Sequence, residues 1–352
     1  MMKVLYYPLI QQHLIHSAQA GDYLTDTLFH GLRSILGEDL IDGYQMWHQY
    51  DTACKKTLPK LWGKGFTTYG LLPDIEIDRE DIGSKIQNKY FDYIICPMHH
   101  TMVQDWAATR VIIEKILEHY PANKVCLVDG WDRPHTDTSL ISLVPFFKRE
   151  INEKTKEAKP ISFSIPKEKI RPLRSDAKEF DFAPLVPAYG HFDDPHMKSY
   201  IYNTEEEYYD MYTDSHFAYT CKKGREDVLE ESWDCMRHYE ILAAGSIPYF
   251  TDIEKCPEKS MFRFPKDLCV RAKKMAGVFP GTKESFDSSK DTFIGTSKAI
   301  KSGEDRGYID FKKFNSSEYQ NLLIEFREYT EKYLTTEAMA KYLLEEMKKC
   351  SE

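Results

Sequence analysis

The 352-residue chain has no excess of positive charge. Its 47 lysines and arginines stand against 56 aspartates and glutamates, which gives a formal net charge of −9. A protein that binds nucleic acid mainly by neutralising phosphates needs a basic surface, so we expect no nucleic-acid partner. A small anionic ligand held in a local basic pocket is compatible with this balance.

Long hydrophobic runs are also missing. No stretch approaches the roughly 18 apolar residues that a membrane-spanning helix requires, so we expect no transmembrane segment. The run "MMKVLYYPLI" continues into polar "QQH" without a small-residue cleavage signal, and we interpret it as a core strand. Together these features predict a cytoplasmic protein.

The eight cysteines include no C-x-x-C pair. Several lie in apolar runs such as "YIICPM" and "KVCLVDG", which is typical of buried free thiols in a reducing compartment. The histidine pairs His99 and His100, and His13 and His16, have no third metal ligand at a recognised spacing. We therefore expect no metal site.

The composition is that of a globular enzyme, with 42% hydrophobic and 29% charged residues. Its length suits two domains, each with its own core. The 23 tyrosines and 19 phenylalanines are many. They are compatible with sugar-facing surfaces, although cores and interfaces account for most aromatic residues.

Strand-like and helical segments alternate along the chain, and the strands are nearly continuous in apolar residues. This favours an α/β fold with parallel sheets covered on both faces. A charged, irregular segment at 166–189 reads as an interdomain connection, and 279–308 reads as a long loop. We expect an N-terminal domain (1–168), a C-terminal domain (169–334), both Rossmann-like, and a terminal helix (335–352) that packs back on the first domain. Strands are expected at 3–8, 39–44, 91–98, 123–131, 142–151, 160–166, 216–221 and 246–250, and helices at 20–37, 103–120, 203–215, 233–244 and, in two pieces, 316–349.

The stretch "WDCMRHYEILAAGSIPYF" reads as a helix followed by a buried strand. Ser232 can cap the helix, Asp234 lies in its first turn, and Gly245 suits a left-handed C-terminal residue. Helical spacing places Arg237 and Glu240 on one stripe that also carries Trp233 and Ala244.

Two interpretations fit the charges on this stripe. Arg237 and Glu240 can form a surface ion pair worth about 0.2–0.5 kcal/mol. Alternatively, the small and aromatic neighbours leave room for a ligand. A guanidinium suits phosphate oxygens and a carboxylate suits ribose hydroxyls, which favours a nucleotide.

Basic residues follow the strand-like "FAYTC" directly upstream of this helix. Lys222, Lys223, Gly224 and Arg225 stand at the expected carboxyl end of the strand, where open α/β sheets bind ligands such as a diphosphate. A solvated charged turn is the alternative interpretation of the same letters.

Together, "SHFAYTCKKGR" and "WDCMRHYEILAAGSIPYF" resemble the donor-binding half of GT-B glycosyltransferases. The similarity is to the exostosin-like type, with its R-x-x-E-x-L-A-x-G-x-I-P pattern, and covers 215–250. Weaker similarity to related transferases lies in "AGDYLTDTLFHGLR", "VDGWDRP", "FFKRE" and "PISFSIP". The resemblance implies two Rossmann-like domains facing across a cleft, with C-terminal helices. It makes 1–168 the acceptor-side domain and 169–334 the nucleotide-sugar-binding domain.

The resemblance also implies site residues. The helix glutamate of that family holds the donor ribose and nearby basic residues hold the diphosphate. This carries over to a donor-binding set of Lys222, Lys223, Arg237, Glu240, Tyr219 and Gly245. The insertion "GREDVLEE" lengthens the connection before Trp233, so no role is carried over to Arg225.

GT-B enzymes generally stabilise the leaving diphosphate with helix ends and basic side chains. No D-x-D motif stands in a suitable setting here, and "FDD" at 192–194 is the nearest pattern. We therefore expect metal-independent transfer from a nucleotide sugar, a UDP- or GDP-sugar, without a bound cofactor.

Glycosyl transfer needs fixed cations at the leaving diphosphate and, for inversion, a base near the acceptor hydroxyl. Asp129 and Asp132 stand at the end of a predicted strand, and His135 is a third candidate for the base. Asp22 is expected on the acceptor side. An aspartate after a strand also caps turns and helices, so capping is the alternative for each of these carboxylates.

The leading interpretation is a hexosyl- or pentosyltransferase acting on a glycan, glycoconjugate or other hydroxyl acceptor. A polysaccharide pyruvyl transferase is one alternative, because that class has a similar two-domain architecture and a Gly-Asp pair before a helix; its donor is phosphoenolpyruvate. A non-catalytic sugar-nucleotide-binding protein is the other.

Overall fold

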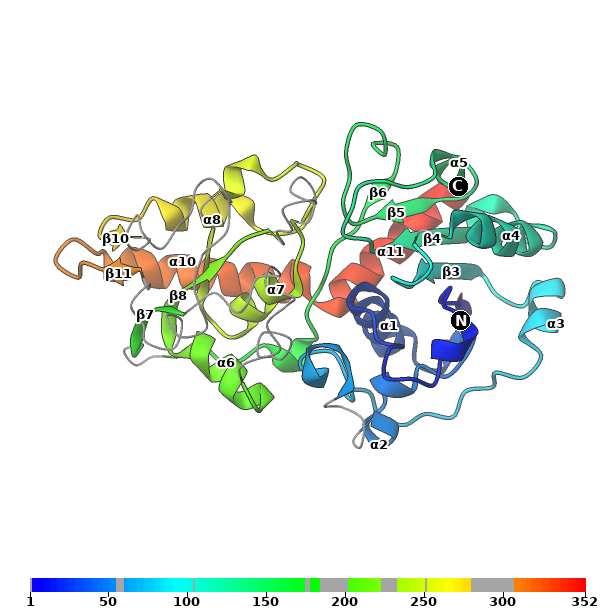
Figure 1. Ribbon diagram of the computed structural model, residues 1–352, viewed down its shortest axis with the longest axis horizontal. Helices are drawn as coiled ribbons and strands as arrows, with labels where there is room; N and C mark the ends of the chain where they lie inside the picture. Colours follow the sequence, from blue (N-terminus) through cyan, green and yellow to red (C-terminus); the bar gives the residue numbers. More distant parts are fainter. Residues whose placement is uncertain are drawn as a thin grey trace. The chain divides into compact units, whose positions relative to one another are not determined.

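The chain forms two compact units in the computed structural model (Figure 1). Unit 1 comprises Met1–Pro166, Pro257–Phe262 and Thr335–Glu352, and unit 2 comprises Lys167–Cys256 and Arg263–Leu334. The structure describes residues 2–54, 60–103, 105–174, 178–183, 202–222, 233–250, 252–279 and 307–352. Each unit is an α/β structure, as the alternation of strands and helices predicts.

Unit 1 contains a six-stranded sheet in the order β2-β1-β3-β4-β5-β6, and all neighbours are parallel. Parallel strands are buried on both faces, which explains the continuous apolar runs in the sequence. The strands are β1 (Val4–Tyr6), β2 (Leu40–Asp42), β3 (Tyr93–Met98), β4 (Val125–Asp129), β5 (Phe146–Lys148) and β6 (Lys159–Pro160).

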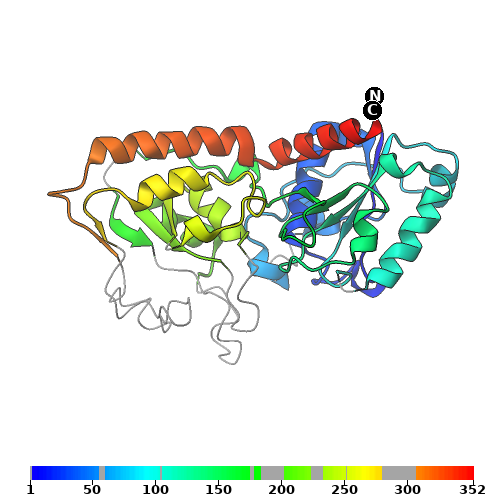
Figure 2. The same ribbon diagram turned by 90° about the horizontal axis from the view of Figure 1, so that it is seen from above.

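Helices cover both faces of this sheet (Figure 2). On one face, α1 (Tyr23–Leu36) packs against α11 (Thr336–Ser351). The two helices approach so closely that a Cβ on Gly31 would lie 2.0 Å from the carbonyl oxygen of Thr336, so this position requires glycine. The other face is covered by α4 (Trp106–Leu117). The unit also contains α2 (Asp51–Cys54), α3 (Ile82–Gln87) and α5 (Thr138–Ile141).

Unit 2 contains a three-stranded parallel sheet in the order β7-β8-β9. The prediction of an irregular connection at 166–189 was wrong in part, because Phe180–Ala183 forms β7. The other strands are β8 (Ser215–Thr220), β9 (Ile247–Phe250) and the antiparallel pair β10 (Val278–Phe279) and β11 (Tyr308–Ile309). The helices are α6 (Glu205–Thr213), α7 (Met236–Ala243), α8 (Lys266–Lys273) and α10 (Ser316–Tyr329), which continues as a π-helix over Thr330–Leu334.

Helix α7 begins later than the sequence predicts. Its first residue is Met236, Cys235 is extended and makes no side-chain cap, and Ser232 lies outside the described residues. Every residue of α7 is buried, and Arg237, which is 9% exposed, is the most accessible of them. The C-terminal prediction is confirmed: Gly245 has a φ of 79°, and its N–H donates to the carbonyl of Leu242.

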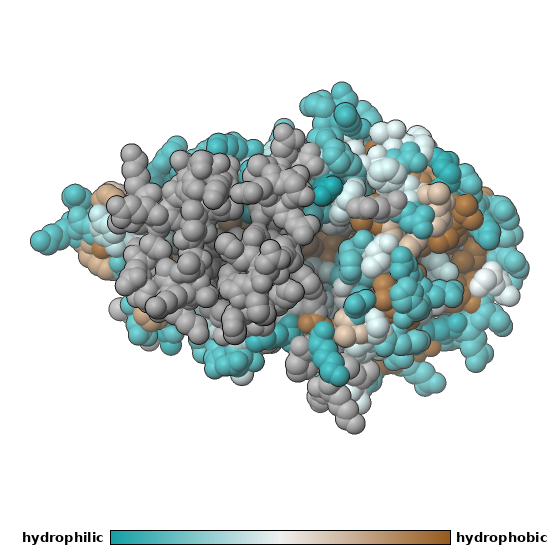
Figure 3. All heavy atoms as spheres, in the orientation of Figure 1, coloured by the Kyte–Doolittle hydropathy of each residue, from teal (hydrophilic) through white to brown (hydrophobic). Residues whose placement is uncertain are grey.

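The visible surface of unit 1 is mostly hydrophilic, with smaller hydrophobic areas among the polar residues (Figure 3). Within the described ranges, no helix combines the length and the apolar character needed to cross a membrane. The seven cysteines whose side chains are described are free, and five of them are buried: Cys96, Cys126, Cys221, Cys235 and Cys269.

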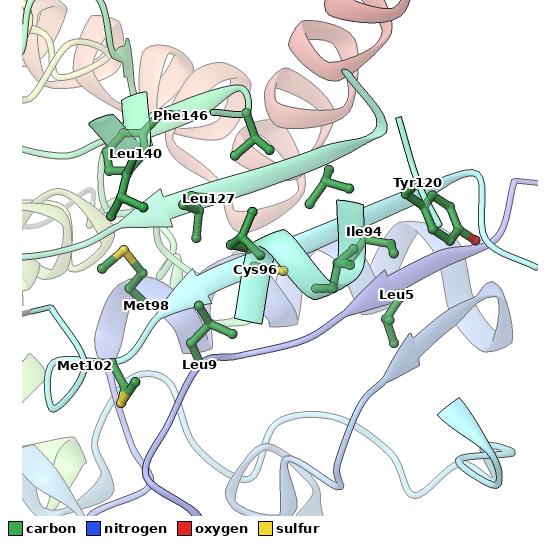
Figure 4. Packing of buried hydrophobic residues seen from close by; sticks show 14 of the residues in the cluster. Leu5, Leu9, Ile94, Cys96, Met98, Met102, Tyr120, Leu127, Leu140 and Phe146 are labelled. Carbon is green, nitrogen blue, oxygen red and sulfur yellow. The ribbon is translucent and has the colours of Figure 1, made fainter. Parts of the chain in front are cut away.

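The core between the unit 1 sheet and α4 reaches the carboxyl edge of the sheet (Figure 4). Met98, the last residue of β3, is packed there with Leu9 and Met102. The N–H of His99 donates to the carbonyl of Leu9 at 3.0 Å. This apolar packing and the hydrogen bond fix the backbone at the carboxyl end of β3, where His99 and His100 follow the strand.

Candidate functional site

Arg237 is held at the carboxyl end of β8. Its Nε donates to Oγ1 of Thr220, the last residue of the strand, and its Nη2 donates to the carbonyl of Cys221, both at 3.0 Å. Lys222 follows directly, with its Nζ 5.5 Å from the ring centroid of Trp233. The structure therefore brings two predicted donor-binding cations to the strand end where α/β sheets bind ligands.

Thr220 also fixes the residue that follows Arg237. Because Oγ1 of Thr220 accepts from Arg237, its own O–H is directed to Nδ1 of His238 at 2.7 Å. Nε2 of His238 then carries the proton and donates to the carbonyl of Trp233 at 2.9 Å. Sequence reasoning missed both Thr220 and His238. A threonine ending a strand and a histidine beside the arginine are the only marks they leave in the sequence.

Glu240 points toward α6 in the interior of unit 2. Its Oε2 accepts from the hydroxyl of Tyr208 at 2.6 Å, and only 2% of the glutamate is exposed. A surface ion pair with Arg237 is therefore not the reason for these two charges. The contact with a donor ribose remains a prediction, and Tyr208 is the partner that the sequence did not reveal.

The remaining donor-binding candidates have different surroundings. The ring of Tyr219 stacks on Phe182 at a centroid distance of 4.8 Å, and burial raises the pKa of its hydroxyl. The carbonyl of Gly245 accepts from Nζ of Lys178 at 2.7 Å. Core packing and helix termination account for these two positions. Lys223 lies outside the described residues, as do Gly224, Arg225 and 192–194.

Asp129 is locked in a buried ion pair in unit 1. Its Oδ2 accepts from Nζ of Lys148 at 2.6 Å, its Oδ1 accepts from the N–H of Trp131 at 2.9 Å, and both charged side chains are fully buried. A general base must reach the hydroxyl that it deprotonates. Asp129 does not reach the surface in this conformation.

The other two candidates for the base are more accessible. Asp132 forms an ion pair with Arg149, and 43% of its side chain is exposed. Nε of the buried Arg149 donates to the carbonyl of Gly130 at 2.9 Å, which fixes the guanidinium beside this loop. His135 is exposed in the same loop after β4. Both remain candidates for a base.

Asp22 meets two histidines at the carboxyl edge of the unit 1 sheet. It caps α1, because its Oδ1 accepts from the N–H of Thr25 at 3.2 Å, as the capping alternative predicts. Its Oδ2 accepts from the N–H of His100 at 3.1 Å and lies 3.4 Å from Nδ1 of the same residue. One ligand atom each from Asp22, His99 and His100 lie within 4.8 Å of one another. The third metal-binding group that sequence spacing did not reveal thus comes from the start of α1.

The sheet order explains this meeting. β1 and β3 are neighbours, with β2 on the other side of β1. Strand order reverses between β1 and β3, and the crevice at such a switch point is where α/β proteins bind ligands. Burial opposes ionisation of Asp22, but the hydrogen bond to His100 and the charges of His99 and His100 outweigh it and hold the pKa well below its usual range. Burial lowers the pKa of His99.

A buried polar network lies behind Asp22. The N–H of Asp22 donates to Oδ2 of Asp26 at 2.7 Å, and Oδ1 of Asp26 lies 2.7 Å from Nε2 of His48. Asp26 and His48 are both buried, and the ring of Tyr69 packs edge-on against His48. Burial raises the pKa of the Tyr69 hydroxyl. None of these three residues was found from the sequence, because a polar residue inside a helix or a loop has no spacing that marks its partner.

No protein-family model matches this chain, and no curated protein matches it either. The chemistry of both clusters therefore has to be judged from their own residues.

Proposed function

We propose that the chain is a glycosyltransferase of the GT-B class that moves a hexosyl or pentosyl group from a nucleotide sugar to a glycan, a glycoconjugate or another hydroxyl acceptor. The observation that supports this best is the fixed guanidinium of Arg237 at the carboxyl end of β8, beside Lys222. The resemblance of 215–250 to the exostosin-like donor half gives these residues their proposed ligand. Cytoplasmic action belongs to the same proposal and is favoured by the buried free thiols.

In the proposed reaction the nucleoside diphosphate leaves from the anomeric carbon and gains negative charge. Cations that are already fixed stabilise this charge without a cost of reorganisation in the transition state. Arg237 meets this condition, because two hydrogen bonds orient its guanidinium before any ligand binds. Lys222 adds a second positive charge at the same strand end, so the departure of the diphosphate needs no metal ion.

The acceptor hydroxyl loses its proton to a base in unit 1. Asp132 and His135 are the two candidates that solvent reaches. The variants Asp132→Asn and His135→Gln identify the base. Loss of the true base removes transfer while nucleotide binding persists.

The direct test is hydrolysis of nucleotide sugars by the purified chain, measured as release of UDP or GDP. We expect one nucleotide sugar to be cleaved slowly in the absence of an acceptor, since water can replace the acceptor. Lys222→Ala should lower this rate by about 10²-fold, the size seen when one charge-stabilising donor is removed.

Lys332→Ala is the matched control. Its Nζ lies 4.8 Å from the ring centroid of Tyr333, so it removes a comparable lysine–aromatic contact from the π-helix of unit 2 and leaves the residues at the end of β8 unchanged. Its rate should equal that of the unchanged protein. Absence of hydrolysis with every nucleotide sugar, together with no binding of UDP or GDP, would contradict the proposal.

A further inference from the structure

We infer that Asp22, His99 and His100 form a binding site for a divalent transition-metal cation of the zinc class at the carboxyl edge of the unit 1 sheet. All three ligands belong to unit 1. The site does not depend on the proposed transferase activity, whose cations belong to unit 2.

The ligand atoms are already near the spacing that a metal imposes. Nδ1 of His100 lies 3.4 Å from Oδ2 of Asp22. Two ligands that are each about 2.0–2.1 Å from a tetrahedral zinc ion lie about 3.3 Å apart. This pair therefore needs no rearrangement. The third group is within 4.8 Å of the other two, so a small rotation of the His99 side chain completes the set.

His99 supplies an independent indication of a ligand. Its side chain is 1% exposed, and its Nε2 forms no hydrogen bond of normal geometry with any described residue, although the ring lies close to the backbone of Gly21. A buried ring nitrogen that lacks a well-aligned hydrogen-bond partner costs free energy, so such atoms are rare unless something binds them. A metal ion beside Asp22 would provide that partner.

Neighbouring hydrogen bonds orient the ligands as they do in known metal sites. Thr101 holds the ring of His99 at Nδ1, which lies 2.9 Å from Oγ1 of Thr101 and accepts from its backbone N–H at 3.3 Å. Metal binding at Nε2 therefore requires the tautomer in which Nδ1 donates its proton to Oγ1 of Thr101. The other carboxylate oxygen of Asp22, Oδ1, accepts from the N–H of Thr25. The backbone N–H of Asp22 donates to Oδ2 of Asp26. These contacts hold the Asp22 carboxylate in place.

The ligand set indicates the class of ion and the character of the site. Two imidazoles and one carboxylate suit zinc, cobalt or iron better than magnesium or calcium, which prefer oxygen ligands. The side chain of His100 is 55% exposed, so one side of the cluster is open to solvent. Three protein ligands and an open position are the arrangement of catalytic metal sites, where water or a substrate oxygen completes the coordination.

The test is titration of the full chain, stripped by a chelator, with zinc chloride and with cobalt chloride. We expect one zinc ion per chain by calorimetry and by metal analysis after dialysis. Cobalt should give the visible bands of a low-coordinate site of nitrogen and oxygen ligands. The spectrum should show no thiolate charge-transfer band. Its absence distinguishes cobalt binding at this site from cobalt binding by any of the eight cysteines.

Two variants locate the site. His100→Ala removes an exposed ligand, and Asp22→Asn removes the charge but keeps a residue that caps helices equally well. Each should weaken zinc binding by about 10²-fold or more, since even loss of a group that supports a ligand costs 10–100-fold. His119→Ala, a histidine that follows the far end of α4, should bind zinc as the unchanged protein does.

Three results would overturn the inference: no stoichiometric zinc binding, zinc binding that is unchanged in both His100→Ala and Asp22→Asn, or a cobalt spectrum dominated by thiolate ligands. The transferase proposal is tested separately, because nucleotide-sugar hydrolysis is compared between the unchanged protein and variants of Lys222 and Lys332, which belong to unit 2.

Discussion

Nε of Arg237 donates a 3.0 Å hydrogen bond to Oγ1 of Thr220, and this contact joins α7 to the carboxyl end of β8. The same hydroxyl is 2.7 Å from Nδ1 of His238, so one threonine positions two successive side chains of the helix. The guanidinium is thereby held at the carbonyl of Cys221, the residue before Lys222, before any anion arrives. The proposed diphosphate site depends on this relationship.

Thr220→Val should destabilise unit 2 and weaken nucleotide binding. Valine has nearly the same shape but leaves the buried Nε of Arg237 and Nδ1 of His238 without this partner, which should cost about 1–3 kcal/mol in the free energy of unfolding. Urea denaturation measures the loss. Thr330→Val is the control, because the hydroxyl of Thr330 only donates back to the carbonyl of Phe326 within its own helical segment. Equal losses in the two variants would show that Thr220 has no special positioning role.

Glu240 and Tyr208 allow the structural and the ligand-binding roles of the α7 carboxylate to be separated. Tyr208→Phe removes the hydroxyl that donates to Glu240 and should cost about 1–3 kcal/mol of stability, because the buried carboxylate loses a donor. Glu240→Gln keeps an oxygen that accepts this bond and should cost less than Tyr208→Phe. If Glu240 also contacts a donor ribose, the glutamine variant binds UDP or GDP more weakly while melting near the normal temperature. A large melting loss with unchanged nucleotide affinity would make the residue purely structural.

The buried pair of Asp129 and Lys148 should be the most sensitive charge pair of unit 1. Lys148→Met leaves the fully buried Asp129 carboxylate without its cation, which should cost about 3–5 kcal/mol. Lys159→Met, which breaks the partly exposed pair with Glu346, should cost less than about 1 kcal/mol. Chemical denaturation of both variants gives the comparison. Similar, small losses would mean that Asp129 is solvated and remains available as a base.

His216 should make unit 2 less stable in acid. Burial lowers the pKa of His216 below its ordinary value, and the nearby charge of Lys178 acts in the same direction. The unfolded chain therefore binds the proton more readily than the folded chain, and the free energy of unfolding falls as the pH drops through the unfolded value near 6.5. Compared with His216→Gln, the unchanged protein should lose more stability between about pH 7.5 and about pH 5.5. Parallel losses in the two proteins would contradict the assignment.

The sequence predicts those parts of the fold that local patterns determine. The apolar runs of β3 and β4, and the start of α1 at Asp22, follow from periodicity and capping alone. Strand β7 was missed because only the second half of Phe180–Ala183 is fully buried, so its apolar pattern is weak. Helix α7 was placed a turn too early, since the extended Cys235 has no local mark in the sequence.

The candidate site was predictable only where its residues are close in sequence. Arg237 and Lys222 were identified, and they flank the same strand end. Asp22 was identified without its partners, because His99 and His100 reach it through the pairing of β1 with β3. Lys148 was not recognised as the partner of Asp129 for the same reason, since parallel pairing of β4 with β5 brings them together.

The most direct measurement for the central claim is calorimetric titration of the unchanged protein, Lys222→Ala and Lys332→Ala with UDP and with GDP. We predict that one of these nucleotides binds the unchanged protein and Lys332→Ala with the same affinity, and binds Lys222→Ala about tenfold or more weakly because a charge-assisted contact to the diphosphate is lost. Equal affinity in all three proteins, or no binding of either nucleotide, would contradict the account.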